Sequence, residues 1–469
     1  MEAIMSARQI EPLLLGYFAH AIKSQPNNPA NPNKCRQTDS RLSWTRHITA
    51  GPEDHITTIA STGAGKGTGA LIPNLLRNSG PAVVIDPKGE NYLVTARARA
   101  RMGHRVVLLD PFEVISRFTP NAATDQFNPL DVLRKENHQL EDDTVAMADM
   151  LVTGRSQTDP FWDRAACDLI SGILAYLRSD GPKALQTLTE LHHLLGDNYD
   201  GLRTFTQEEL AGHSRFIQTK IGMTVASPEK TRGSIQTVAL AHCGIFASKR
   251  VACATSRTSF SLDDFIAGKP MTIYIVFPPE KLRSHAALLR IWLACLIQLI
   301  ARRTRAPEQI TTLFVDEAAQ LGTLDELRTA ITLMRGYGVR LWTFWQDLSQ
   351  LKSLYPKDWQ SILNNSGVIQ IFGRNQTLAL NEMTSLCDPF CDDFSLFIPP
   401  GEQLLLRRDG PSLKATQLDY RYDPAFTGLF DPNPFYQKSV FSQSKADHDV
   451  ENRRTFTQDL APFDLNRGN

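Results

Sequence analysis

Residues 55–69 constrain the fold more than any other stretch of this sequence. They open with a short β-branched run, residues 56–59, which predicts a buried strand. A loop with several glycines and one lysine follows, and the apolar segment after it predicts a helix. Glycines let backbone N–H groups close round an anion, and a helix N-terminus adds partial positive charge. The stretch therefore predicts a phosphate-binding loop.

Eight loop residues are predicted to bind a nucleoside triphosphate: Ser61, Thr62, Gly63, Ala64, Gly65, Lys66, Gly67 and Thr68. Lys66 is expected to reach the β- and γ-phosphates. The match to G-x-x-x-x-G-K-[ST] is incomplete, because Ala60 replaces the first glycine and Gly67 replaces the hydroxyl residue that contacts magnesium. Thr68 comes one residue late and is a candidate to contact either magnesium or a phosphate. The alternative is a glycine-rich surface loop with a solvated lysine.

Two adjacent acids, Asp316 and Glu317, follow a short apolar-leaning run at residues 312–315. A carboxylate at the tip of a buried strand beside a phosphate loop can hold magnesium through water, and Asp316 is the candidate. Glu317 is the candidate to polarise the attacking water. The alternative is that both acids cap the strand or start the next helix. Gln346 ends the following strand and is a candidate sensor of the γ-phosphate, unless its amide satisfies backbone groups.

Cleavage of a γ-phosphate also needs positive charge in the transition state, which a neighbouring subunit often supplies through an arginine. The two candidates are Arg335, between the acid pair and Gln346, and Arg374, just past the last predicted strand. Each of them is also compatible with an ordinary surface arginine.

The order of apolar segments predicts an α/β fold with a doubly wound, mostly parallel sheet. Predicted strands begin near residues 56, 81, 105, 271, 311, 339 and 368, and a late hairpin begins near residue 404. Between them, residues 135–252 show helical spacing and no convincing strand, which predicts an inserted all-α domain. Phe161 and Trp162 in this insertion are expected to be core residues rather than a base-stacking site.

The chain of 469 residues is long enough for two or three domains. The predicted division is an N-terminal arm or linker, a nucleotide-binding domain in two parts around the all-α insertion, and a C-terminal tail. Their bounds are 1–47, 48–134, 135–252, 253–422 and 423–469.

Charge and cysteine content limit the partners and the compartment. Lys plus Arg and Asp plus Glu both number 50, so any DNA contact must come from a local patch or from a ring of subunits. Seven scattered cysteines suit a reducing cytosol, and Cys387 and Cys391 lack a second pair at zinc-binding spacing. No signal peptide is visible, and neither residues 13–22 nor residues 286–301 predict a membrane span.

Five segments in this order resemble the TraG/TraD-type coupling proteins of type IV secretion and conjugation. They are residues 60–69, 84–90, 161–165, 314–322 and 345–351. The resemblance covers about residues 48–420, and that family tolerates Lys-Gly in place of Lys-Ser/Thr. It implies a RecA-like P-loop ATPase with an all-α domain inserted between sheet strands. It also implies ATP and Mg²⁺ as ligands and a ring, commonly a homo-hexamer, around translocating DNA or protein.

By position, the resemblance implies that Lys66 and its loop bind ATP and that Asp316 and Glu317 form the Walker B pair. It implies a sensor role for Gln346, and Arg335 matches the spacing of the family's trans-acting arginine. In that family the inserted helical domain faces the substrate and the relaxosome. Typical members begin with transmembrane helices, which this sequence does not show. We therefore expect a cytoplasmic protein that a partner tethers at the inner membrane, or a soluble branch active in DNA mobilisation or defence.

Two functions are consistent with these residues. The first is an ATP-driven motor that moves single-stranded DNA or a relaxase–DNA complex and works with type IV secretion components. The second is a nucleotide-gated docking platform, which binds ATP and recruits secretion or mobilisation substrates with little turnover. Stimulation of ATP hydrolysis by DNA would separate them.

Overall fold

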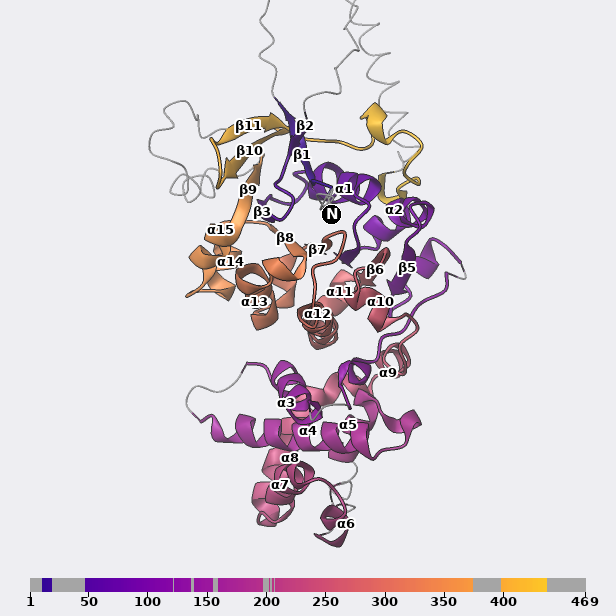
Figure 1. Ribbon diagram of the computed structural model, residues 1–469, viewed down its shortest axis with the longest axis vertical. Coiled ribbons are helices and arrows are strands. Elements are labelled where there is room, and N and C mark those ends of the chain that lie inside the picture. The colour runs from indigo at the N-terminus through magenta and orange to yellow at the C-terminus, as the bar shows by residue number, and fades with distance from the viewer. Residues whose placement is uncertain are drawn as a thin grey trace, which may run out of the picture.

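The computed structural model of the protein describes residues 11–18, 47–120, 122–135, 139–154, 159–196, 202, 205, 207–373 and 398–436. The described residues form one eleven-stranded sheet with the order β2-β1-β11-β10-β9-β3-β8-β7-β4-β6-β5. Figure 1 shows helices packed around this sheet and a separate group of helices below it. Arg374, Cys387 and Cys391 lie outside the described residues.

Seven neighbouring strands of the sheet run parallel to one another. In spatial order they are β9 (Ser366–Phe372), β3 (His55–Ile59), β8 (Val339–Trp345), β7 (Thr311–Val315), β4 (Ala82–Asp86), β6 (Met271–Val276) and β5 (Arg105–Leu109). β3, β4, β6, β7 and β8 are buried at every position. Helices cover both faces of such a sheet, so its strands are continuous apolar and β-branched runs. The predicted mostly parallel α/β sheet is confirmed.

The sheet register places the ends of three strands at one edge. Ile59, the last residue of β3, pairs with Trp345, the last residue of β8. Near the end of β7, Val315 pairs with Thr343 of β8. The segments after these strands therefore begin next to one another. We call this the carboxyl edge of the sheet, where parallel α/β folds place their ligands.

Antiparallel strands extend the sheet beyond β9. β10 (Glu402–Arg407) and β11 (Leu413–Thr416) form a hairpin, which confirms the hairpin predicted near residue 404. β1 (Leu14–Phe18) pairs with β11 and with β2 (His47–Thr49). The sequence did not predict β1 and β2, because these short strands are stabilised by pairing: β1 pairs with β11, about four hundred residues away, and β2 pairs with β1.

Eight helices of the described chain surround the sheet: α1 (Ile72–Arg77), α2 (Glu90–Arg101), α10 (Leu262–Ile266), α11 (Pro279–Leu282), α12 (Ala286–Ala301), α13 (Asp325–Leu333), α14 (Leu348–Leu354) and α15 (Trp359–Asn365). Trp292 of α12 is fully buried and donates a hydrogen bond to the Phe127 carbonyl at 2.9 Å. In the part of the chain that the structure describes, no helix is both long and apolar enough to cross a bilayer.

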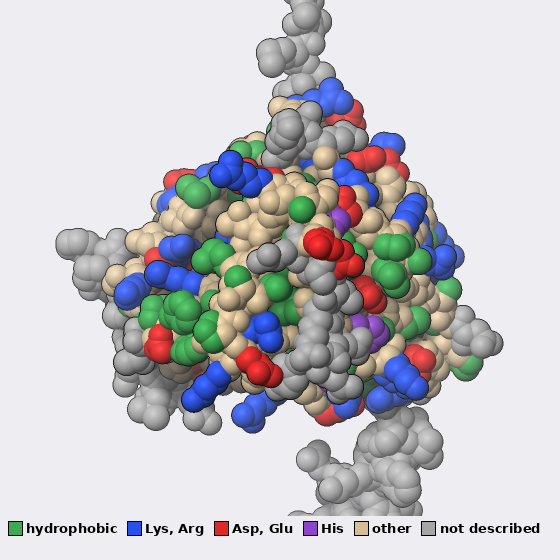
Figure 2. Space-filling view, turned by 90° about the horizontal axis from the view of Figure 1, so that it is seen from below, with side chains coloured by type: hydrophobic (Ala, Val, Ile, Leu, Met, Phe, Trp, Pro, Cys, Tyr) green, Lys and Arg blue, Asp and Glu red, His purple; other side chains and the backbone are tan. Residues whose placement is uncertain are grey.

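The described residues from 139 to 254 form helices and no strands. They are α3 (Leu140–Leu151), α4 (Phe161–Ser179), α5 (Leu188–Gly196), α6 (Gln207–Ala211), α7 (Arg215–Val225), α8 (Glu229–Cys243) and α9 (Lys249–Ala254). Figure 1 shows α4 crossing the middle of this group. Figure 2, seen from the end where these helices lie, shows Lys and Arg interspersed with Asp and Glu rather than gathered in one basic patch.

One prediction for this helical segment is wrong. Phe161, expected in the core, is 55% exposed, and Trp162 is partly buried. Phe161 is the first residue of α4, and the next turn of that helix carries its buried stripe, beginning at Ala166. The Trp162 indole donates a hydrogen bond to the Asp159 carboxylate at 3.1 Å, which holds it near the surface. Apolar identity alone did not show where the stripe begins.

Candidate functional site

The phosphate-binding loop leaves the end of β3 and requires glycine at two positions. Gly63 and Gly65 have φ angles of 78° and 97°, in the left-handed region that other residues rarely adopt. A Cβ on Gly65 would lie 3.3 Å from the Thr68 hydroxyl, so a side chain there would crowd the loop as well as strain it. The first helical turn begins at Gly67 and continues into α1. The loop therefore joins β3 to a helix, which is the strand, loop and helix order that the sequence predicted.

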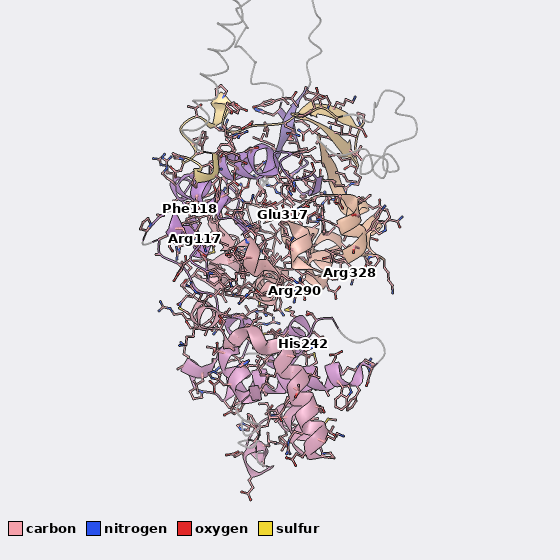
Figure 3. All side chains as sticks on the ribbon, turned by 180° about the vertical axis from the view of Figure 1, so that it is seen from behind. Arg117, Phe118, His242, Arg290, Glu317 and Arg328 are labelled. Atoms are coloured by element: carbon pink, nitrogen blue, oxygen red, sulfur yellow. The ribbon has the colours of Figure 1, made fainter. Side chains whose placement is uncertain are left out.

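Three predicted site residues meet in one contact at the carboxyl edge. The Lys66 ammonium donates to Oε1 of Glu317 at 3.0 Å, and the two form an ion pair. The Gln346 amide donates to Oε2 of the same carboxylate at 3.0 Å. Lys66 follows β3, Glu317 follows β7 and Gln346 follows β8, so the contact joins segments that are remote in sequence. Figure 3 shows Glu317 within the sheet portion of the molecule.

Glu317 has an uncommon backbone conformation. Its φ and ψ are 52° and 50°, a left-handed conformation that costs a non-glycine residue free energy. Such conformations persist where the surrounding contacts hold them, and here Lys66 and Gln346 hold the side chain. The Glu317 backbone N–H also donates to Oδ1 of Asp316 at 3.0 Å. The turn therefore directs both carboxylates toward the phosphate loop.

Asp316 lies below this turn and is partly buried, and the loss of solvation raises the pKa of its carboxyl to about 6. The nearby Lys66 ammonium opposes this shift, whereas the Glu317 carboxylate adds to it. A buried carboxylate with a raised pKa gains much from a divalent cation, because the cation replaces the lost solvation. Asp316 therefore has the surroundings of a magnesium-associated acid.

Asp86 at the end of β4 is a second buried acid that the predicted site did not include. Its carboxylate accepts hydrogen bonds from the Tyr92 N–H at 2.9 Å and from the Asn91 amide at 3.3 Å. Burial raises its pKa to about 7, and the neighbouring Asp316 adds to the shift. The sequence could have indicated this residue, because Asp86 is the last residue of an apolar run that forms a parallel strand.

The burial of Asp86 leads to a prediction for stability. In the unfolded chain this carboxyl titrates near pH 3.9, so between about pH 4 and pH 7 the folded protein holds a proton that the unfolded chain has lost. The free energy of unfolding should therefore fall as pH rises through this window, by up to about 1.4 kcal/mol per pH unit from this group. Urea unfolding near pH 5 and near pH 8 should show a smaller loss for Asp86→Asn than for the wild type. Equal losses would contradict the assignment.

Most of the predicted site residues line a cavity of about 490 Å³ at the carboxyl edge, whereas Ser61 and Gln346 do not line it. Its walls include the phosphate loop, Asp86, Asp316 and Glu317. The remaining walls come from residues that were not predicted: Pro87, Lys88, Glu90, Asn91, Pro400, Gly401, Gln417, Leu418, Asp419, Arg421 and Tyr436. The last five lie in the chain after β11, where no motif marked them. A cavity of this size fits a nucleotide.

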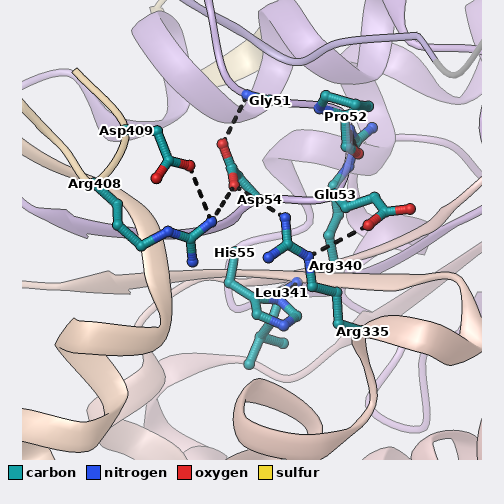
Figure 4. Close-up of polar contacts among 10 residues, drawn as sticks. All are labelled: Gly51, Pro52, Glu53, Asp54, His55, Arg335, Arg340, Leu341, Arg408 and Asp409. Carbon is teal, nitrogen blue, oxygen red and sulfur yellow. Dashed lines mark hydrogen bonds and ion pairs between the residues drawn. The ribbon is translucent and has the colours of Figure 1, made fainter.

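Arg335 does not join this site in its own chain. It precedes β8 whereas Gln346 follows it, so the two residues lie at opposite edges of the sheet. Its guanidinium lies 3.4 Å from the Glu53 carboxylate and 3.5 Å from the Asp54 carboxylate (Figure 4). Asp54 also pairs with Arg408 at 3.3 Å. The side chain of Arg335 is 45% exposed, so this ion-pair cluster lies at the surface.

Together, the parallel sheet, the glycine loop with its lysine and the acid pair at the carboxyl edge define a P-loop nucleotide-binding protein. The sequence matches the family described as Type IV secretory system Conjugative DNA transfer over residues 21–383. The chain belongs to this family. The resemblance to coupling proteins that the motifs indicated is thereby confirmed.

Relatives with known names agree with this assignment. Protein VirD4 of Rhizobium rhizogenes is 29% identical over 364 residues, which is 76% of this chain and 52% of VirD4. Protein VirD4 of Agrobacterium fabrum is 30% identical over 333 residues, 70% of this chain and 48% of the relative. Conjugal transfer protein TraG of Escherichia coli is 25% identical over 372 residues, which is 74% of this chain and 56% of TraG. The chain thus spans about half the length of these curated relatives.

Solved structures share the fold. The unbound conjugative coupling protein TrwBdeltaN70 has a TM-score of 0.60 and 17% identity, covering 78% of this chain and 84% of its own. VirB4 of Thermoanaerobacter pseudethanolicus has a TM-score of 0.54 and 15% identity, and the match covers 90% of this chain and 100% of the VirB4 chain. At such identities the likeness concerns the fold, and it agrees with the predicted α/β fold with a mostly parallel sheet.

Proposed function

We propose that this protein binds ATP with Mg²⁺ and hydrolyses it to drive the transfer of DNA or of a nucleoprotein substrate. The observation that carries the proposal is the Glu317 carboxylate, held between Lys66 and Gln346 beside the phosphate loop. Solved complexes of the structural neighbour TrwB support it. They contain a non-hydrolysable ATP analogue, and ADP with Mg²⁺.

The donor set suits a magnesium–triphosphate group. The glycine loop offers backbone N–H groups, Lys66 offers a buried ammonium and Asp316 offers a partly buried carboxylate that lines the cavity. Thr68 donates its hydroxyl to the Gly65 carbonyl at 3.3 Å, and it is the loop hydroxyl proposed to turn toward the cation or a phosphate. Among the described residues, no three His, Cys, Asp or Glu side chains form a metal cluster. That suits Mg²⁺, which keeps waters and phosphate ligands and neutralises charge on the departing phosphate.

The ion pair at the centre of the site suggests how its residues act. In the free protein Lys66 and Glu317 neutralise each other. The β- and γ-phosphates compete for the same ammonium, so nucleotide binding releases Oε1 of Glu317. Gln346 keeps its hydrogen bond to Oε2 and thereby fixes the carboxylate. Glu317 then accepts the proton of the attacking water.

The proposal also keeps the predicted division into a two-part nucleotide-binding domain and an inserted helical domain. The helical domain is proposed to face the substrate.

Arg335 is proposed to act on the site of a neighbouring subunit in a homo-hexameric ring. Its exposure and its distance from its own carboxyl edge support a role in trans. In such a ring one chain supplies the loop and the acid pair, and the next supplies positive charge for the transition state. The proposed cargo is single-stranded DNA or a relaxase–DNA complex. The proposed partners are type IV secretion components, one of which would tether this cytoplasmic protein at the inner membrane.

The test is to measure ATP hydrolysis and particle mass together, with and without single-stranded DNA. A motor should assemble with ATP into particles of several subunits, and DNA should raise its rate of hydrolysis by about tenfold or more. Arg335→Ala should assemble and bind ATP yet hydrolyse it slowly. ATP binding with no turnover at any DNA concentration would instead favour the docking platform. Failure to bind ATP would overturn both functions.

A further inference from the structure

The phosphate loop and the acid pair explain one end of the cavity and leave the other end without a role. The second end is formed by the chain after β11, whose residues Gln417–Tyr436 we call the strap. Gln417, Asp419, Arg421 and Tyr436 of the strap all line the cavity. The strap has contacts that fix both of its ends against the nucleotide-binding residues.

At its beginning the strap packs against the phosphate loop helix. The Tyr420 N–H donates to the Thr68 carbonyl at 3.3 Å. The Leu418 carbonyl lies so close to Gly69 that a Cβ there would be 2.9 Å from it. The Gln417 N–H donates to the Gly401 carbonyl at 2.8 Å. This end of the strap therefore follows the loop backbone.

Farther along, the strap returns over the start of α2. The Asn433 amide donates to Oε1 of Glu90 at 2.7 Å and to the Tyr420 hydroxyl at 3.3 Å. The Phe435 ring meets the Phe118 ring edge-on, with centroids 5.3 Å apart. These contacts place Tyr436 at the mouth of the cavity, where its side chain is 51% exposed.

Within the strap, Arg421 is held in a fixed orientation. Its Nε and Nη2 donate to the two carboxylate oxygens of Asp419 at 2.9 and 2.6 Å. The guanidinium carbon lies 4.9 Å from the centroid of the Tyr436 ring and 5.2 Å from that of Tyr422. The paired carboxylate uses the edge of the guanidinium, and its plane contacts the rings of Tyr436 and Tyr422, so Arg421 holds the Tyr436 ring in place.

We propose that Arg421 and Tyr436 form the base-binding end of the nucleotide site, a step that rests on the function proposed above. With the triphosphate at Lys66, the ribose and base must extend away from Glu317, and the strap lines the cavity in the other direction. The base stacks on the face of the Tyr436 ring that is turned away from the Arg421 guanidinium, and the guanidinium supports the ring from the other face. Stacking accepts any base and favours the larger purines. The site therefore binds ATP and GTP with similar affinity and pyrimidine triphosphates more weakly.

The test compares ATP with inorganic tripolyphosphate, which has the same charged end and no base. Wild-type protein should bind ATP more tightly than tripolyphosphate. Tyr436→Ala should weaken ATP binding by about tenfold and leave tripolyphosphate binding unchanged. Tyr436→Phe, which keeps the ring, should bind both ligands like the wild type. Tyr422→Ala is the matched control, because Tyr422 also contacts Arg421 but does not line the cavity.

Each other outcome has a definite meaning. Unchanged ATP affinity in Tyr436→Ala would overturn the proposal, and so would an equal loss for both ligands, which would indicate damage to the loop. Equal affinity of the wild type for ATP and tripolyphosphate would overturn the base site and leave the proposed function standing. A wild type that binds neither ligand would refute the proposed function itself.

Discussion

Replacing Glu317 with glutamine is expected to lower the rate of ATP hydrolysis by about a hundredfold to ten-thousandfold while ATP binding is retained. Glutamine keeps the size of the side chain and can still bond to Gln346, but it cannot accept a proton from water. The ion pair with Lys66 is also lost, so ATP binding no longer requires that this ion pair be broken before the lysine contacts the phosphates. Binding of ATP should therefore be as tight as in the wild type or tighter.

The measurement is a single-turnover hydrolysis rate together with a dissociation constant for ATP. Glu280→Gln is a suitable control, because it makes the same chemical change at a side chain that is 60% exposed on α11. This control should hydrolyse ATP at the parental rate. A Glu317→Gln protein that also keeps the parental rate would show that another group takes the proton, and the proposed role of Glu317 would fall.

The left-handed backbone at Glu317 makes the choice of substitution important. A glycine there would relieve the backbone strain and remove the carboxylate in one step, so stability and activity would change together. Glutamine leaves the strain of the left-handed backbone at residue 317 unchanged. A loss of turnover in Glu317→Gln at unchanged thermal stability can then be attributed to the carboxylate.

The part of the site that could be predicted from the sequence is the part encoded by local patterns. Lys66, Glu317 and Gln346 each come after a short buried run that forms a parallel strand, namely β3, β7 and β8. Parallel strands share one carboxyl edge, so the positions of three short runs along the chain were enough to bring these residues together. The fold class and the convergence of these three residues were predicted in this way, whereas the family was predicted from the resemblance of five motif segments.

Other features depend on contacts between distant segments and carry no local signal. β1 exists because it pairs with β11 and because Asn74 of α1 bonds to both the N–H and the carbonyl of Leu14. Asp54 forms ion pairs with Arg335 and Arg408 on the side of the sheet opposite the carboxyl edge, although neither arginine is near it in sequence. The strap is held by single hydrogen bonds and by Tyr420 and Phe426, which pack in a small apolar cluster with residues of α1 and α2. None of these contacts produces periodicity, so sequence patterns could not reveal them.

Replacing Lys66 with alanine is the second change with a large expected effect, and it acts on binding rather than on turnover. Hydrogen bonds to charged groups contribute about 1.5–3 kcal/mol each, and Lys66 is expected to contact two phosphates. Because the free protein already uses this ammonium to neutralise Glu317, each of the two bonds is taken at the low end of that range, which gives about 3 kcal/mol in all. We therefore expect ATP affinity to fall by about a hundredfold in Lys66→Ala.

The control is Lys269→Ala, which also removes a lysine from an ion pair, in this case an exposed one with Asp264. Exposed pairs contribute about 1 kcal/mol or less, and this one lies away from the cavity, so ATP affinity should stay at the parental value. Isothermal titration of both variants with ATP and Mg²⁺ gives the comparison. If Lys66→Ala binds and hydrolyses ATP like the wild type, the buried ammonium serves only to neutralise Glu317. The glycine loop would then be a structural turn, and the case for a triphosphate at this edge of the sheet would fail.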